Sequence, residues 1–126
     1  MSLDGFSLSP LIVELNAKLA GGRIEKIFQT DKYTLVIWVR QGNENFRLLI
    51  SANPTHPRIH LTEAAPENPA VPPAFCMLLR KHLEDGRIAQ ICQHGLDRIA
   101  LLYVDIRGER GAIVTKCLIT ELMGKH

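Results

Sequence analysis

The sequence predicts an α+β domain with two helices and about seven mostly antiparallel strands. Two segments carry the start and stop signals of helices, and the rest consists of short runs rich in β-branched and aromatic residues. Turn residues separate these runs. The chain has 126 residues, of which 46% are hydrophobic and 22% charged, as in an ordinary globular domain. This length favours a single domain with one core.

The first helix is expected to begin after Ser9, which is a good N-cap, with Pro10 at the first helical position. Gly21 or Gly22 ends it. Its apolar stripe is expected to consist of Leu11, Ile12, Leu15 and Leu19.

Three strands are expected to follow this helix, at residues 23–29, 34–39 and 46–51. Asp31 and Lys32 supply the turn between the first two.

A proline-rich region separates these strands from the second helix. Pro54 and Pro57 disfavour regular pairing before a short strand at residues 58–61. Four further prolines within residues 63–73 indicate a linker.

The second helix is expected after Pro72 and Pro73, and it ends at Asp85 and Gly86. Its residues available for burial are Phe75, Met77, Leu78 and Leu83. Its exposed face is expected to carry Arg80, Lys81 and Glu84.

The last third of the sequence is predicted to form a β-meander with strands at residues 87–93, 99–106 and 112–122. Turns are expected at residues 94–97 and 108–111. The alternating pattern still runs in the last of these strands, so we expect the protein to continue beyond residue 126.

Composition and motifs argue against several classes of protein. No apolar run approaches the roughly 20 residues of a membrane span, and no secretion signal is recognisable, which favours a cytoplasmic protein. The odd, widely spaced Cys76, Cys92 and Cys117 indicate buried thiols in a reducing compartment. His56 and His60 lie beside prolines and do not suit a metal site, so no metal or other cofactor is expected. The sequence contains no Gly-x-Ser-x-Gly elbow, Walker loop or dinucleotide fingerprint, which argues against an enzyme.

Charged and aromatic residues leave a structural and a functional interpretation open. Asp97 and Arg98 lie in a predicted hairpin turn, where they are either turn residues with a surface ion pair or a site that binds phosphate or a base edge. One interpretation of the cluster Arg80, Lys81, His82, Arg107 and Arg110 is a basic surface; the more common one is a solvated helix face and a turn. Core packing is the expected role of the aromatic residues Phe28, Tyr33 and Trp38, with base stacking as the alternative. The net charge of +2 neither requires nor excludes binding to nucleic acid.

Four stretches together resemble the N-terminal NFACT domain of the RqcH and fibronectin-binding-protein-A-like family. They are LDG with VELN, GGRIEKIFQ, PPAFCMLLRKHLEDGRI, and GLDRI with ELMGKH. In this order and spacing the four stretches span nearly the whole chain, and FCMLLRKH and GLDR are the most specific of the motifs.

The resemblance implies a module that binds tRNA in ribosome-associated quality control. Family members recruit alanyl-tRNA to obstructed large ribosomal subunits and drive template-free alanine tailing, while the ribosome itself supplies peptidyl transfer. The implied tRNA-binding residues are Asp97 and Arg98, with Asp4, Glu121, Leu122 and Met123 as secondary candidates, and Arg80 and Lys81 as further phosphate contacts. The family motif usually continues past His126, which leaves the placement of Leu122 and Met123 open.

The implied fold is a β-sandwich with flanking helices, similar to the N-terminal domain of formamidopyrimidine-DNA glycosylases. Those enzymes use an N-terminal proline as nucleophile, whereas this chain begins Met1, Ser2, Leu3. We therefore expect binding and no catalysis. The older family name makes a fibronectin-binding adhesin the alternative function, against which the missing signal peptide and the free cysteines argue.

Overall fold

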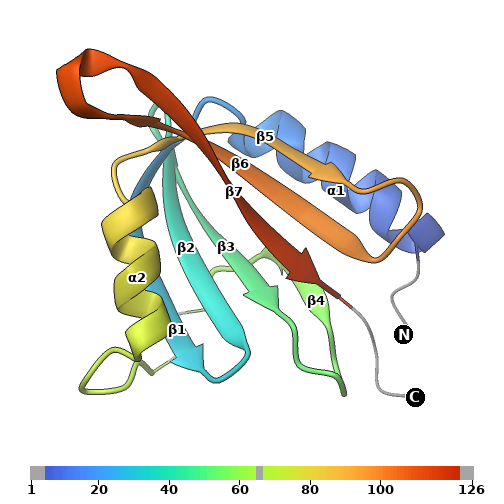
Figure 1. Ribbon diagram of the computed structural model, residues 1–126. Helices are drawn as coiled ribbons and strands as arrows, with labels where there is room; N and C mark the ends of the chain where they lie inside the picture. Colours follow the sequence, from blue (N-terminus) through green and yellow to red (C-terminus); the bar gives the residue numbers. More distant parts are fainter. Residues whose placement is uncertain (1–4, 65–66, 123–126) are drawn as a thin grey trace.

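The computed structural model of the chain describes residues 5–64 and 67–122, with side chains from Leu8 onward. Seven strands pair antiparallel in the order β4-β3-β2-β1-β5-β6-β7, and two helices flank them (Figure 1). The elements are α1 (Gly5–Leu19), β1 (Arg23–Asp31), β2 (Thr34–Gln41), β3 (Glu44–Ser51), β4 (Arg58–Leu61), α2 (Ala74–Leu83), β5 (Arg87–Gln93), β6 (Ile99–Arg107), the 3-10 turn η1 (Glu109–Gly111) and β7 (Ile113–Glu121). The predicted antiparallel α+β architecture is confirmed.

The seven strands form one continuous sheet, so the two layers expected of a sandwich are connected. The halves β4-β3-β2-β1 and β5-β6-β7 join through a single residue pair, Arg23 with Arg87. They diverge from this junction, as Figure 1 shows. The backbone approaches closely there: a Cβ on Gly86 would lie 2.3 Å from Ile106 Cδ1, and one on Gly22 would lie 2.6 Å from Val39 Cγ1. Glycine at both positions permits the junction.

Where the two halves of the sheet diverge, some backbone groups at the strand edges have no neighbouring strand. Polar side chains on or next to the two helices form hydrogen bonds with these groups. Glu84 Oε2 accepts a hydrogen bond from the Ile27 amide of β1 (3.1 Å), and Arg80 Nε donates to the Ile27 carbonyl (2.8 Å). On the other half, Asn16 Oδ1 of α1 accepts from the Ile91 amide of β5 (2.8 Å). The helices thereby satisfy backbone groups that a continuous ladder would otherwise pair.

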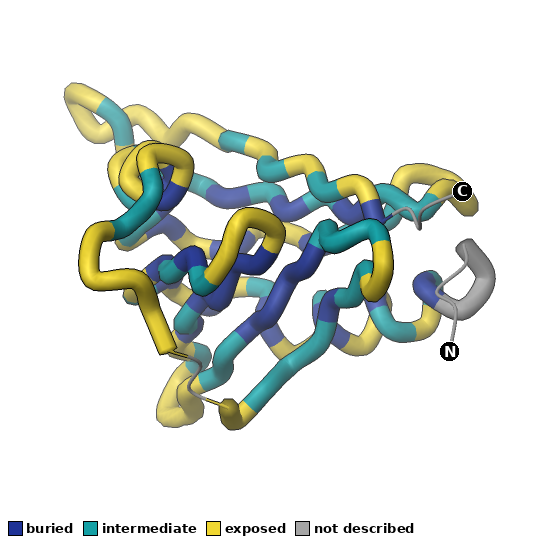
Figure 2. The backbone as a smooth tube through the Cα atoms, turned by 90° about the horizontal axis from the view of Figure 1, so that it is seen from below, coloured by how far each residue is buried: buried dark blue, intermediate teal, exposed yellow. Residues whose placement is uncertain are grey.

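The core combines the inner face of α1 with inward-facing residues of both halves of the sheet. Figure 2 shows buried positions along the central strands and exposed positions in the connecting loops. Leu8, Ile12, Leu15 and Leu19 of α1 are buried, and Leu11 packs beside them. The expected stripe of the first helix is thus correct.

The first helix begins earlier than predicted. It starts at Gly5 and contains Pro10 within its length. The Pro10 nitrogen would face the carbonyl of Phe6, so the helix does without one hydrogen bond in its second turn.

The prediction for the buried face of the second helix is correct at Leu83 and wrong at its other three residues. Phe75, Met77 and Leu78 are about half exposed, at 49%, 52% and 51%, whereas Cys76 and Leu79 are buried together with Leu83. Residues 74–79 are apolar on all sides of the helix, so composition alone did not reveal which side packs on β1.

Two further predictions about burial are wrong. Of the three free cysteines only Cys76 is buried, while Cys92 is half-buried and Cys117 exposed. Phe28 and Trp38 pack on each other outside the core cluster, with ring centroids 5.2 Å apart, and Tyr33 is 40% exposed.

Strand boundaries match the predictions to within a few residues. β4 and β5 coincide with the predicted segments, and β1 extends to Asp31, whose carboxylate accepts from the Tyr33 amide (2.9 Å) in the turn that follows. Within the described ranges, no helix combines the length and the apolar character that crossing a membrane requires.

Candidate functional site

The turn between β5 and β6 presents the most specific predicted site. The Asp97 amide donates to the His94 carbonyl (3.0 Å), and the His94 amide donates to the Ile99 carbonyl (3.1 Å). Gly95 adopts φ +59° with open space around it. Gln93 Nε2 also donates to the Asp97 carbonyl (2.7 Å). The backbone of this turn is therefore fixed by hydrogen bonds from both strands.

The Asp97 carboxylate lies beside the His94 imidazole. His94 Nδ1 and Asp97 Oδ2 are 3.1 Å apart, and the two side chains are 68% and 65% exposed. Such an exposed pair contributes only about 0–1 kcal/mol to stability. Its main effect is to orient the carboxylate on the surface of the turn.

The end of β7 lies against the same turn. The Leu122 amide donates to the Arg98 carbonyl (2.7 Å), and Glu121 is paired with Ile99 in the sheet register. The structure thus brings Asp97, Arg98, Glu121 and Leu122 together. The Leu122 side chain is 0% exposed, which makes it an anchor in the core and not a surface contact. Asp4 and Met123 lie outside the described residues.

The structure does not bring Arg80 and Lys81 to this site. Both belong to α2, which Figure 1 shows on the opposite side of the molecule from the loop between β5 and β6. Besides its bond to Ile27, Arg80 places its guanidinium 5.3 Å from the Phe28 ring, and its side chain is only 28% exposed. Arg80 therefore has a structural role, whereas Lys81 is exposed on the surface.

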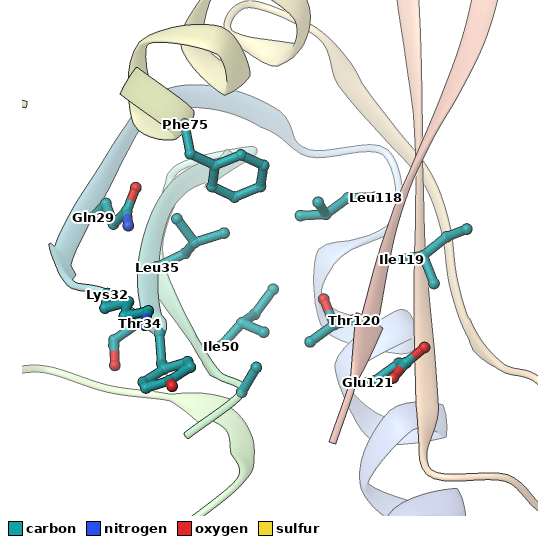
Figure 3. Close-up of a pocket in the computed structure, with 12 residues that line it drawn as sticks. Gln29, Lys32, Thr34, Leu35, Ile50, Phe75, Leu118, Ile119, Thr120 and Glu121 are labelled. Atoms are coloured by element: carbon teal, nitrogen blue, oxygen red, sulfur yellow. The ribbon is translucent and has the colours of Figure 1, made fainter. Parts of the chain in front are cut away.

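A pocket of about 390 Å³ opens between β7 and the opposite half of the sheet (Figure 3). Its apolar lining includes Leu35, Ile50, Phe75 and Leu118. Gln29 also lines it; this residue is 8% exposed, and its Oε1 has no hydrogen-bond partner in the described part of the chain. Sequence reasoning missed the pocket because its lining comes from separate segments, although Glu121 belongs to it.

Tyr103 and Cys117 form a cross-strand pair on β6 and β7. Partial burial raises the pKa of the Cys117 thiol, Cys92 raises this pKa further, and a hydrogen bond with Tyr103 lowers it. Charge on Cys117 is the main cause that raises the pKa of Tyr103, followed by desolvation and Cys92. Both groups are therefore protonated at neutral pH, and Cys117 is a poor nucleophile there.

Comparison with known proteins places the chain among ribosome quality-control relatives. Residues 4–126 match the family of NFACT N-terminal and middle domains. All 126 residues are 46% identical to the Rqc2 homolog RqcH of Bacillus subtilis (strain 168), of which the chain covers 22%. A stretch of 92 residues, 73% of this chain, is 34% identical to the ribosome quality control complex subunit NEMF of Homo sapiens and covers 8% of it.

Solved structures of related proteins have the same fold as this chain. The N-terminal domain of the fibronectin-binding protein PavA from Streptococcus pneumoniae superposes with a TM-score of 0.92 at 43% identity, over 99% of this chain and 47% of that one. The N-terminal part of the fibronectin/fibrinogen-binding protein from Streptococcus suis gives 0.93 at 41% identity, again over 99% and 47%. The chain spans about a fifth of the bacterial RqcH relatives that it matches. Sequence and structure together show that the chain belongs to the NFACT family, within its N-terminal and middle domains.

Proposed function

We propose that this domain is the tRNA-binding module of a ribosome-associated quality-control factor. Family membership supports the setting, because relatives across bacteria and animals carry names from ribosome quality control. The observation that carries the residue assignment is the turn of Asp97 and Arg98, whose backbone accepts hydrogen bonds from the Leu122 amide after β7 and from the Gln93 side chain of β5. A fixed, exposed turn is suited to recognition because its geometry exists before the ligand arrives.

In this proposal Arg98 supplies the main contact to tRNA. A guanidinium group presents its donors in a planar fork that fits phosphate oxygens or a base edge. Asp97, oriented by His94, accepts a hydrogen bond from a base amino group, and Glu121 lies beside the same turn. The unstacked bases of a tRNA anticodon loop offer both kinds of partner.

The full-length protein would use this contact to recruit alanyl-tRNA to obstructed large ribosomal subunits for template-free alanine tailing. The ribosome would supply the peptidyl transfer, so the domain itself binds and does not catalyse. The proposed location is the cytoplasm, where ribosomes and tRNA are found.

The test is a titration of labelled tRNA with the wild type, Arg98→Ala and Arg98→Lys. Loss of an arginine that reads a base costs on the order of 1–3 kcal/mol. Arg98→Ala should therefore weaken binding by roughly five- to 150-fold. Arg98→Lys should recover little, because it keeps the charge and loses the planar fork.

A matched control is Arg107→Ala, which removes an exposed arginine at the far end of β6. Thermal unfolding of every variant separates loss of binding from loss of structure. Equal affinity of Arg98→Ala and Arg107→Ala for tRNA would refute the residue assignment.

The alternative proposal is binding to fibronectin, since two solved relatives are named for it. The Arg98→Ala variant also separates the two proposals. Surface plasmon resonance against immobilised fibronectin and against tRNA should show binding to tRNA alone, and only that binding should depend on Arg98. Tight fibronectin binding without tRNA binding would favour the alternative.

A further inference from the structure

Three arginines lie side by side across the junction of the two halves of the sheet. Arg23 of β1 is paired in register with Arg40 of β2 and with Arg87 of β5. All three are exposed, and all three line one surface hollow of about 530 Å³, together with Glu25 and Gly42. We call Arg40, Arg23 and Arg87 the arginine row.

Like charges directly opposite each other on neighbouring strands are unfavourable. Asp85 lies 3.6 Å from Arg23 in an exposed pair, and Glu25 lines the same hollow. Considering only the described residues, no carboxylate lies within salt-bridge distance of Arg40 or Arg87. Asp105 is paired in register with Arg87, so three carboxylates lie near the three guanidinium groups of the row. Only Arg23 is within salt-bridge distance of one of them, and an anionic partner would complement the guanidinium groups of Arg40 and Arg87.

The backbone beneath the row is held firmly. The Ile24 amide donates to the Gly86 carbonyl and the Ile88 amide to the Gly22 carbonyl, each at 2.8 Å. Arg87 Nη1 donates to the Gly21 carbonyl (3.1 Å), which directs its side chain across the junction. The backbone at the junction and the side chain of Arg87 are thus positioned before any ligand binds.

A second row continues the same outer surface. Trp38 lies two residues before Arg40 on β2 and is paired with Lys26 on one side and Arg47 on the other. The Arg47 guanidinium lies 4.6 Å from the Trp38 ring centroid. Three glutamates, Glu25, Glu44 and Glu63, also line this region. The cations are therefore spread over four strands, which suits a chain of phosphates better than one small anion.

We propose that the arginine row binds the phosphate backbone of RNA without regard to sequence. The inference rests on the proposed function only in taking RNA as the partner, because its residues differ from those of the turn. Arg87 begins β5 and the turn with Asp97 follows the end of the same strand, so the two surfaces lie roughly 20 Å apart. One folded RNA can contact both, with the row adding affinity and the turn adding selectivity.

The experiment compares RNA binding by two double variants of equal charge. Arg40→Gln with Arg87→Gln removes two members of the row, and Arg107→Gln with Arg110→Gln removes two exposed arginines near the turn between β6 and β7. Each protein is titrated with purified tRNA and with a short oligouridylate over a range of salt concentrations. Thermal unfolding checks each variant, and Arg40→Gln alone is a milder version that breaks none of the hydrogen bonds described for residues 5–64 and 67–122.

Loss of the row should weaken binding of both RNAs in parallel. Each phosphate contact contributes about 0.7–0.9 to the slope of log affinity against log salt, so the row variant should reduce that slope by about 1.5. The control variant should leave the slope nearly unchanged. Arg98→Ala should instead reduce the preference for tRNA over oligouridylate.

Comparing these variants on the two RNAs distinguishes failure of the inference from failure of the proposed function. Binding of oligouridylate that depends on the row, without any preference for tRNA, would support the row and refute the assignment of the turn. Equal slopes for the row and control variants would overturn the inference, as would a wild type that binds neither RNA. Displacement of RNA by inorganic phosphate at constant ionic strength and comparable concentration would also overturn it, because the site would then prefer a small anion.

Discussion

Replacing Arg80 by alanine should destabilise the fold, although the sequence placed this residue among the contacts to RNA. Arg80 Nε donates to the Ile27 carbonyl at 2.8 Å, on a β1 edge that no strand covers at that point. A hydrogen bond from a charged donor contributes about 1.5–3 kcal/mol, and the 28% exposure of the side chain favours the lower end of this range. Contact with the Phe28 ring at 5.3 Å adds about 0.5–1 kcal/mol. The Glu84 carboxylate at 4.0 Å adds little.

The expected loss for Arg80→Ala is therefore about 2 kcal/mol in the free energy of unfolding. For a domain of this size that corresponds to a fall in Tm of roughly 8 °C. Urea unfolding followed by circular dichroism measures the free energy, and a thermal scan measures Tm. Lys81→Ala is the control, since this neighbouring lysine is exposed and should change stability by less than about 0.5 kcal/mol. Equal stability of the two variants would refute the structural role of Arg80.

Three further outcomes are expected. Leu122→Ala should cost about 2–5 kcal/mol in urea unfolding, because this side chain is 0% exposed; near-wild-type stability combined with weaker tRNA binding would instead make it a contact residue. Gly86→Ala should cost about 1–3 kcal/mol, because the added Cβ would lie 2.3 Å from Ile106 Cδ1, and an unchanged Tm would show that the junction is looser than described. Alkylation of Cys117 by iodoacetamide should require a higher pH than for an ordinary cysteine, because its thiol pKa is raised and less thiolate forms at a given pH. Cys92→Ser removes one cause of that rise, so the alkylation profile should move to lower pH; a profile that stays in place would argue against the coupling.

Local signals in the sequence predicted most elements. The bounds of β4 and β5 were predicted to the residue, because Pro57 precedes β4 and recognisable turn residues flank β5. The start of the first helix was misplaced because Pro10 suits a first helical position, and Pro10 is also tolerated near the start of a longer helix. The buried side of α2 was missed because residues 75–79 are apolar throughout, so only the contact with β1 distinguishes Cys76 and Leu79 from their neighbours.

The residues of the candidate surfaces were likewise predicted only in part. Asp97 and Arg98 were found because they are adjacent in sequence and lie in a recognisable turn. The arginine row escaped notice because Arg23, Arg40 and Arg87 come from separate strands and meet only through the pairing register. Register across distant segments depends on the whole packing of the sheet, which no local pattern specifies.

Sequencing of the RNA that co-purifies with the full-length protein tests the central claim most directly. The wild type should be enriched in tRNA over its abundance in the cell, and Arg98→Ala should lose this enrichment while unfolding at nearly the wild-type temperature. RNA whose composition matches the cellular pool, or tRNA enrichment that persists in Arg98→Ala, would contradict the account.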